Sequence, residues 1–324
     1  MSSSSFPLLR LPLVAQTEII GNIRLKQLVQ LSLCSKRMHF VVRKYRNKSF
    51  KLELHLRAQR DSEIHIFHCE FPYSDALIIR VSSEDIAESW RTDRIGRKVV
   101  KFMETERELV TYWEDLVYGT KSTIDYMCHL FGVPVKTVRI AENITWPLDI
   151  VEERQGSFYD AFIDSPTISD EILRNILTNY NPSNLWIDSF SRGFQIENFH
   201  KTYDTFAISY GKWLTVDNLY TLDCKKIYCG CKKFNSAELN QYFKHVLAGM
   251  APRLKLIRGM VDIVDENVIL AGIQELLRPI PGKESFVSDD ATWTLRGELD
   301  IRGSSVTVIV RCWKSDNRFE LIIQ

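Results

Sequence analysis

Three cysteines late in the chain, Cys224, Cys229 and Cys231, have the spacing C-x4-C-x-C and could be metal ligands. A tetrahedral zinc site needs a further pair of Cys or His residues at a suitable spacing, and none completes this one. If residues 227–231 form a strand, Cys229 and Cys231 face the same side, where buried thiols behave as small hydrophobic groups. We therefore expect no metal here. An enzyme that uses the Cys or His groups remains an alternative, which elemental analysis and thiol reactivity would test.

The other groupings of reactive residue types have simpler interpretations. His65, His68 and Cys69 lie on or beside a predicted strand, and we interpret them as satisfied or exposed side chains. Residues 119–123, Gly-Thr-Lys-Ser-Thr, suggest a phosphate-binding loop. That loop needs Gly directly before Lys, however, and a second glycine where Glu114 stands. The sequence also has no signature of a serine hydrolase, a zinc-dependent protease or a kinase, and it predicts no catalytic residue and no cofactor.

The composition indicates a globular chain whose partners are proteins. Its 324 residues are 45% hydrophobic, which is enough for a sizeable core. Because 42 Lys and Arg residues stand against 41 Asp and Glu residues, the net charge of +1 gives no long-range attraction for nucleic acid or an anionic membrane. The basic stretch 36–48, with Phe40 and Tyr45, could indicate nucleic-acid binding. A solvated helix face explains so local a charge more simply.

The cysteine count and the first residues predict an intracellular location, cytoplasmic or nuclear. Seven scattered cysteines do not suggest a disulfide framework and favour a reducing compartment. Pro7, Arg10 and Pro12 interrupt the apolar residues at the start, so they do not form the continuous core of a signal peptide. Charged residues also interrupt every apolar stretch before it reaches the roughly 18 residues of a membrane span.

Apolar residues between Gln16 and Val42 recur largely at intervals of three and four, which predicts three short helices with apolar stripes. Residues 1–5 before them, which include the polar run of Ser2 to Ser5, are predicted to be a disordered tip, and Pro7 and Pro12 fix an extended approach to the first helix. A bundle this small has more apolar surface than it can bury by itself. We therefore expect a partner protein to cover part of it.

After Lys48 the apolar period changes from helical to alternating. Residues 52–56 and 64–66 alternate apolar with polar side chains, which predicts the two strands of a hairpin. Residues 77–81 predict a further strand. The stretch 84–115 is rich in charged residues, and we expect helix and loop there.

The middle of the chain repeats a helix followed by a short strand. We expect helices at 123–131, 169–178 and 236–248, and short strands at 137–140, 185–187, 227–229 and 254–257. Because the units have irregular lengths, the pattern indicates a degenerate solenoid that resembles leucine-rich repeats. Alternation in 293–295, 306–310 and 319–323 predicts an antiparallel meander at the end.

Four aromatic residues lie where such a body could present a surface to a substrate: Trp186, Trp213, Tyr220 and Tyr228. Packing in the core is the more frequent role of aromatic side chains at this spacing, so both interpretations stay open.

Two segments resemble a known family. Leu11-Pro12, Ile19-Ile20, Leu28, Leu31, Leu33 and Ser35-Lys36 follow the F-box pattern, and the resemblance extends over residues 6–46. Residues 234–244 and 267–273 resemble the F-box-associated domain of nematode F-box proteins. One departure is Gly21-Asn22, a pair of poor helix formers where the first helix should end, which predicts fraying there.

The resemblance implies a three-helix F-box that binds a Skp-family adaptor and, through it, cullin and RING subunits. Burying one leucine contributes roughly 1.5 to 3 kcal/mol, so a few anchors would supply most of the affinity. The alternative is that these residues only build an internal core. The expected adaptor contacts are Leu11, Pro12, Ile19, Ile20, Leu25, Leu28 and Leu31.

These observations together predict an α/β chain: an N-terminal three-helix F-box, then an irregular leucine-rich-repeat-like body of helices and strands with an antiparallel C-terminal meander. The expected domains are the tip at 1–5, the F-box at 6–48 and an F-box-associated, substrate-binding domain at 49–324. The implied function is that of a substrate-recognition subunit of a cullin-RING (Skp-cullin-F-box) ubiquitin ligase, with an unknown protein substrate. The alternative is a Skp-binding scaffold without a ligase role.

Overall fold

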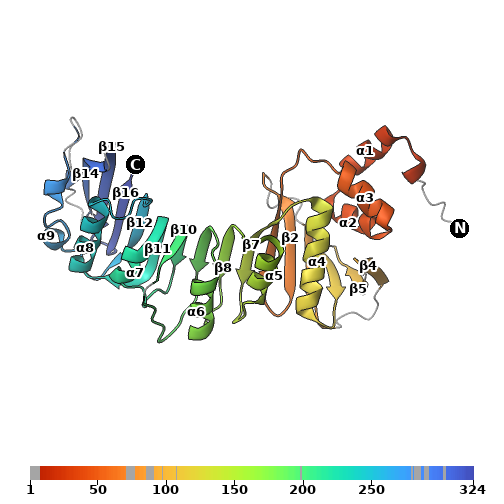
Figure 1. The fold of residues 1–324 in the computed structure, drawn as a ribbon, viewed down its shortest axis with the longest axis horizontal. Coiled ribbons are helices and arrows are strands. Elements are labelled where there is room, and N and C mark those ends of the chain that lie inside the picture. Colours follow the sequence, from red (N-terminus) through yellow and green to blue (C-terminus); the bar gives the residue numbers. More distant parts are fainter. Residues whose placement is uncertain are drawn as a thin grey trace. The chain divides into compact units, whose positions relative to one another are not determined.

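The computed structural model describes residues 8–70, 77–84, 91–96, 98–106, 108–197, 199–278, 280, 286–287, 292–301 and 304–324. The predicted tip at 1–5 lies outside the described residues. The chain forms two compact units, which are drawn in Figure 1. The first comprises Met1–Ile140 with Trp146–Gly156, and the second comprises Ala141–Thr145 with Ser157–Gln324.

Three short helices begin the first unit, as predicted. After a 3-10 turn, η1 (Leu8–Arg10), they are α1 (Leu13–Gly21), α2 (Leu25–Leu33) and α3 (Lys36–Tyr45). The first helix ends at Gly21, where the poor helix formers stand. Ser35 begins α3, because its side chain accepts a hydrogen bond from the backbone N–H of Met38.

A mixed sheet and two further helices form the rest of the first unit, and the strands of the sheet follow the order β7-β1-β2-β3-β6-β5-β4. The predicted hairpin is present, because β1 pairs antiparallel with β2, whereas β1 with β7 and β3 with β6 pair in parallel. The helices α4 and α5 belong to the same unit. The bounds are β1 (Leu52–Ala58), β2 (Ser62–His68), β3 (Leu77–Ser82), β4 (Arg91–Ile95), β5 (Lys98–Glu104), β6 (Glu108–Tyr112), β7 (Val135–Ile140), α4 (Leu116–Phe131) and α5 (Trp146–Gln155).

The prediction of helix and loop for residues 84–115 is wrong, because β4, β5 and β6 occupy much of this stretch. In β5, Val100 and Phe102 are buried, while Lys101 between them keeps exposed surface. The charged residues occupy the solvent face of strands whose other face is buried. A high charge content alone therefore did not identify a two-faced strand.

The second unit contains most of the predicted repeat-like body, whereas the first predicted repeat, the helix at 123–131 and the strand at 137–140, corresponds to α4 and β7 of the first unit. The first five strands of the second unit are parallel neighbours in chain order, from β8 to β12, with helices in several of the connections. Stacking successive units in this way is the arrangement of a solenoid. The elements are β8 (Asp160–Ile163), α6 (Asp170–Asn179), β9 (Asn184–Ile187), β10 (Lys201–Ile208), α7 (Val216–Thr221), β11 (Leu222–Phe234), α8 (Ser236–Leu247) and β12 (Leu256–Val261).

Side-chain caps explain where the helices of this body begin. Ser169 accepts a hydrogen bond from the backbone N–H of Ile172 and begins α6. Asn235 and Glu238 cap each other's backbone at the start of α8, which is a capping box. The sequence did not predict α5, α7, β8 or β10, and its last strand of the body, at 254–257, begins two residues before β12.

The predicted antiparallel meander closes the second unit. β16 pairs antiparallel with β12, so the meander extends the parallel strands as one sheet within the unit. Its elements are α9 (Glu266–Ile269), η2 (Gln274–Leu276), β13 (Phe286–Val287), β14 (Thr292–Ile301), β15 (Ser304–Trp313) and β16 (Arg318–Ile323). Across the described parts of both units, every helix lacks the length and apolarity needed to cross a membrane.

Candidate interaction sites

The beginning of α1 presents apolar side chains to solvent. Leu13 is 56% exposed and Val14 is 75% exposed, and Pro12 directly before them is also exposed. Leu11 and Ile19 are half-buried. This end of the helix therefore shows more apolar surface than isolated solvent-facing residues normally do.

The remaining expected adaptor contacts lie deeper. Leu31 is half-buried, whereas Ile20, Leu25 and Leu28 are buried within the chain. Burial places these three among the core residues of the helices rather than on the accessible surface. The expected set did not include Leu13 and Val14, whose exposure only the structure shows.

Several polar contacts hold the N-terminal helices against the rest of the first unit. Lys26 Nζ of α2 lies 2.9 Å from Glu104 Oε1 of β5 and donates a hydrogen bond to the Thr105 carbonyl at 2.6 Å. The hydrogen bond from Lys26 is the main reason why the pKa of Glu104 is lowered. At the end of α3, Arg46 donates a hydrogen bond to the carbonyl of Phe131 in α4. The helices thus have fixed attachments to both the sheet and α4.

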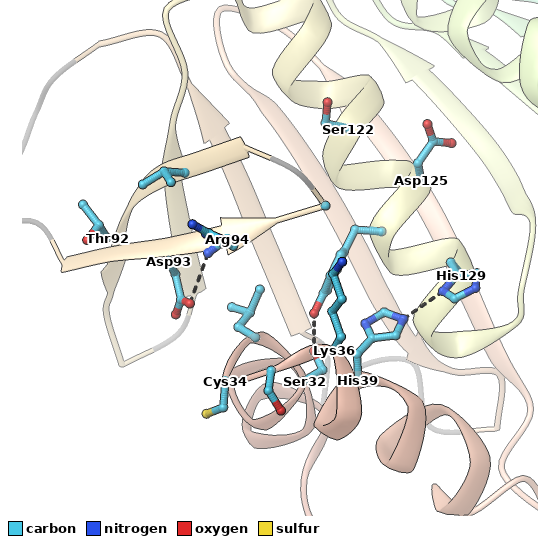
Figure 2. A pocket seen from close by; sticks show the side chains of 15 residues that line it. Ser32, Cys34, Lys36, His39, Thr92, Asp93, Arg94, Ser122, Asp125 and His129 are labelled. Carbon is cyan, nitrogen blue, oxygen red and sulfur yellow. Dashed lines mark hydrogen bonds between the residues drawn. The ribbon is translucent and has the colours of Figure 1, made fainter.

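A groove of about 930 Å³ lies where α2 and α3 meet β4, β5 and α4. In Figure 2, His39 of α3 points toward His129 of α4, and their Nε2 and Nδ1 atoms are 2.8 Å apart. Arg43 donates a hydrogen bond to Nε2 of His129. Burial, followed by the nearby charges, lowers the pKa of both histidines, so their neutral forms are favoured.

A second contact in the groove joins Ser32 of α2 to Tyr126 of α4, whose hydroxyl oxygens lie 2.8 Å apart. Ser32 Oγ also lies 2.6 Å from the Val29 carbonyl, to which it donates. Burial raises the pKa of Tyr126 to about 12, so the phenol stays protonated and is unsuited to act as a base. These polar groups are engaged in holding α2 and α3 on α4.

The sheet of the second unit carries a row of side chains on one face. The row runs in register across β8, β9, β10, β11, β12, β16 and β15. We call it the aromatic–arginine row; its members are Phe162, Trp186, Ala207, Tyr228, Arg258, Glu320 and Arg311.

The helices cover the opposite face of this sheet. Phe319, next to Glu320 in β16, packs against Phe243 of α8 with ring centroids 5.9 Å apart. Because successive side chains of a strand point to opposite faces, Glu320 and the rest of the aromatic–arginine row face away from α8. Trp186 and Tyr228 of the row are half-buried rather than sealed in the core.

The four aromatic residues considered from sequence have different surroundings. Trp186 and Tyr228 belong to the aromatic–arginine row, so they remain candidates for a binding surface. Trp213 is buried, and its ring packs edge-on against Phe194. Tyr220 lies on α7, its ring centroid 4.6 Å from that of His245 in α8.

Two of the three cysteines that the sequence groups together are buried in the core. Cys224 and Cys229 are buried, and burial raises the pKa of Cys224 to about 12, which keeps it a thiol. The side chain of Cys231 lies outside the described residues. In the described part of the chain, no three His, Cys, Asp or Glu side chains are arranged to hold a metal ion.

The earlier groupings also have ordinary surroundings. His65 lies 3.0 Å from Glu63, measured from Nε2 to Oε2, and the ring of His68 packs edge-on against Phe50. Residues 119–123 lie inside α4 rather than in a loop. Gly119 is needed there because a Cβ atom would overlap the Trp113 ring. The glycine is therefore explained by helix packing.

Family models match two segments of the chain. The model described as F-box domain matches residues 8–50, which include α1, α2 and α3, and the model described as F-box associated matches residues 192–258, which include β10 and β11. This pairing is typical of nematode F-box proteins, and both domains are adaptor or interaction modules. It confirms the resemblance found in the sequence, although residues 267–273 lie beyond the second match. No curated protein and no solved structure matches the chain significantly.

Proposed function

We propose that the chain is the substrate-recognition subunit of a Skp-cullin-F-box ubiquitin ligase. It pairs an F-box domain with an F-box-associated domain, as nematode F-box proteins do. The pairing of the two domains is the observation that carries the proposal. The F-box binds a Skp-family adaptor, which links the chain to cullin and RING subunits. The remainder, residues 49–324, holds a protein substrate.

The adaptor contacts in this proposal are the accessible apolar residues of the F-box. Leu11 and Pro12 before α1, Ile19 in α1 and Leu31 in α2 keep exposed surface. Leu13 and Val14, at the start of α1, add to this exposed apolar surface. The other members of the expected set, Ile20, Leu25 and Leu28, are buried in the core and contribute to the stability of the helices. Apolar side chains that are exposed in the single chain gain free energy when a partner removes them from water.

The attachments of α2 and α3 to the first unit have a role in the same proposal. A ligase must hold its substrate within reach of the ubiquitin-charged enzyme, which raises the effective concentration of the substrate's lysines. The contact of Lys26 with Glu104 restricts movement of the F-box against the sheet, and the contact of Ser32 with Tyr126 restricts its movement against α4. A loosely tethered F-box would lower that effective concentration.

The test is co-purification of the full chain with a Skp-type adaptor. Burying two aliphatic side chains contributes roughly 3 to 6 kcal/mol, so Leu13→Asp with Val14→Asp should weaken adaptor binding roughly a hundredfold or more. The control is Ile263→Asp with Met250→Asp, because these second-unit residues are also exposed and apolar. The control should bind the adaptor like the wild type.

The proposal fails if the wild-type chain does not bind a Skp-type adaptor, or if the α1 variant and the control bind it equally. If the adaptor binds and cullin does not join the complex, the chain is a Skp-binding scaffold instead. Lengthening of a bound partner's half-life when the chain is removed supports the ligase role.

A further inference from the structure

The aromatic–arginine row combines two kinds of side chain in a fixed order. At one end the rings of Phe162 and Trp186 stack, with centroids 4.4 Å apart and planes 5° apart. Tyr228 follows two strands further on, beyond Ala207. Arg258 is the next member, on β12. The row thus passes from an aromatic part to a cationic part along a single line of register.

One buried carboxylate organises the cationic part. Glu320 is only 4% exposed, yet its side chain pairs with two arginines whose side chains are 54% (Arg258) and 40% (Arg311) exposed. Nε and Nη2 of Arg258 both donate to Oε1, and Nη1 of Arg311 donates to Oε2 at 3.3 Å. Each guanidinium has five N–H groups, so both retain donors beyond these bonds. The carboxylate therefore orients two cations while neutralising only one.

Further positive charge lies on the same face. Lys226, two residues before Tyr228 in β11, is exposed. Arg296 of β14 pairs with Ile309, two residues before Arg311, and so shares the face of Arg311. Its Nε atom is buried with no hydrogen-bond partner among the described residues. Glu298 and Asp300, two and four residues beyond Arg296, are acidic residues on the same face of that strand. Together with Glu320 they offset three of the four positive charges of Arg258, Arg311, Arg296 and Lys226, so the local charge around the arginines remains positive by one.

We propose that the aromatic–arginine row is the substrate-docking surface and that it binds an extended peptide segment carrying an apolar side chain and carboxylates. The assignment rests on the proposed function and specifies the substrate class for it. Charge complementarity selects the acidic segment, because preoriented guanidinium groups bind carboxylates in paired hydrogen bonds. The stacked rings of Phe162 and Trp186, together with Tyr228, offer the apolar contact.

The register also sets the spacing of the segment. Strands in a sheet are about 4.8 Å apart, so the three steps from Trp186 on β9 to Arg258 on β12 cover about 14 Å. An extended chain advances about 3.3 Å per residue. The apolar residue and the acidic residues should therefore be about four residues apart.

The experiment uses fluorescein-labelled peptides of twelve residues and the full chain bound to its adaptor. The probe, called the Glu probe, is a Gly-Ser peptide that contains one Phe and two Glu residues, four and five positions after the Phe. Three comparison peptides replace both Glu residues by Gln, by Lys or by phosphoserine. A fourth replaces the Phe by Ala. We expect the Glu probe to bind at least roughly tenfold more tightly than the Gln, Lys and Ala versions. Its binding should weaken between 0.05 and 0.5 M salt.

Two variants test the residues without isolating a buried charge. Arg258→Gln with Arg311→Gln and Glu320→Gln removes the whole ion cluster, and it lowers the net charge by one. Lys244→Gln on α8 makes the same change in net charge on the helix-covered side. The triple variant should lose roughly tenfold or more in affinity for the Glu probe, and Lys244→Gln should lose none. The double variant Trp186→Ala with Tyr228→Ala should bind the Glu probe more weakly than the wild type does. It should also bind the peptide with Phe and the peptide with Ala equally tightly.

The inference is overturned if the Glu and Lys peptides bind alike, if only the phosphoserine peptide binds, or if the triple variant and Lys244→Gln behave alike while both fold normally by circular dichroism. Adaptor binding is measured on the same samples. If the adaptor complex forms but the chain does not distinguish the Glu peptide from the Lys peptide, the proposed docking surface is rejected and the proposed function is not. The peptide measurement is also made on the free full chain. If that chain shows the expected selectivity but forms no adaptor complex, the proposed function is rejected and the peptide-binding surface is not.

Discussion

His39 of the F-box and His129 of α4 form a hydrogen bond of 2.8 Å between Nε2 and Nδ1, and Arg43 donates to the second nitrogen of His129. The rings stack with centroids 5.0 Å apart. Protonating either ring would place a second positive charge beside the Arg43 guanidinium. The contact is therefore built for two neutral imidazoles.

We predict that this histidine contact makes the first unit less stable in mild acid. Burial lowers the pKa of His39 and of His129 below the usual value of 6.5. The unfolded chain then binds protons more readily than the folded chain, so stability is retained above pH 6.5 and lost progressively as the pH falls below it. Urea unfolding at pH 7.5 and at pH 5.5 measures how much of the free energy of unfolding is lost on acidification. This loss should be smaller for the double variant His39→Gln with His129→Gln than for the wild type. An equal loss in both proteins would assign the pH dependence to other groups.

A pair of tyrosines predicts opposite effects of removing a hydroxyl. Tyr242 is buried, and its Oη has no hydrogen-bond partner among the described residues, whereas Tyr126 Oη bonds with Ser32. Tyr242→Phe should leave stability unchanged or raise it by about 1 kcal/mol, because an unpaired buried hydroxyl is costly. Tyr126→Phe should lower stability by about 1 kcal/mol. Thermal unfolding of both variants tests the contrast, which is refuted if Tyr242→Phe is the more harmful change.

Two helical glycines predict changes of opposite sign for the same substitution. A Cβ on Gly119 would overlap the Trp113 ring, whereas a Cβ on Gly21 would meet no atom within 4 Å. Gly119→Ala should cost about 1 to 3 kcal/mol through overpacking. Gly21→Ala should stabilise α1 by up to about 1 kcal/mol, since alanine favours helix. Unfolding midpoints of the two variants give the comparison, and stabilisation by Gly119→Ala would contradict the packing role.

The ion cluster around Glu320 predicts strong non-additivity. Arg258→Ala with Arg311→Ala leaves a carboxylate that is buried and without these partners, which should cost about 3 kcal/mol, the lower end for isolating a buried charge. Adding Glu320→Gln to these two changes should restore most of that loss. Urea denaturation of the double and triple variants measures the difference. Equal instability of the two would mean that the lost packing of the arginine stems, rather than the charge, is responsible.

Local patterns in the sequence predicted the elements whose periods are clear. The apolar spacing from Gln16 to Val42 predicted three helices, and alternation in 52–56 and 64–66 predicted the β1–β2 hairpin, because helical and strand periods differ enough to separate them. The Leu11-Pro12 opening also identified the F-box. Periodicity did not identify β4, β5 and β6, where charged residues of the solvent face outweigh the short buried series of Val100 and Phe102.

By itself, then, the sequence determined the N-terminal helices, part of the helix and strand order of the body, and the resemblance of two segments to known domains, since each depends on residues close together in the chain. Only the tertiary structure decided that Ile20 is buried while Val14 is 75% exposed, because apolar character does not tell which neighbour covers a side chain. The same holds for the aromatic–arginine row. Phe162 and Arg311 share one face only because seven strands pair in a particular register, and register is a property of long-range backbone pairing.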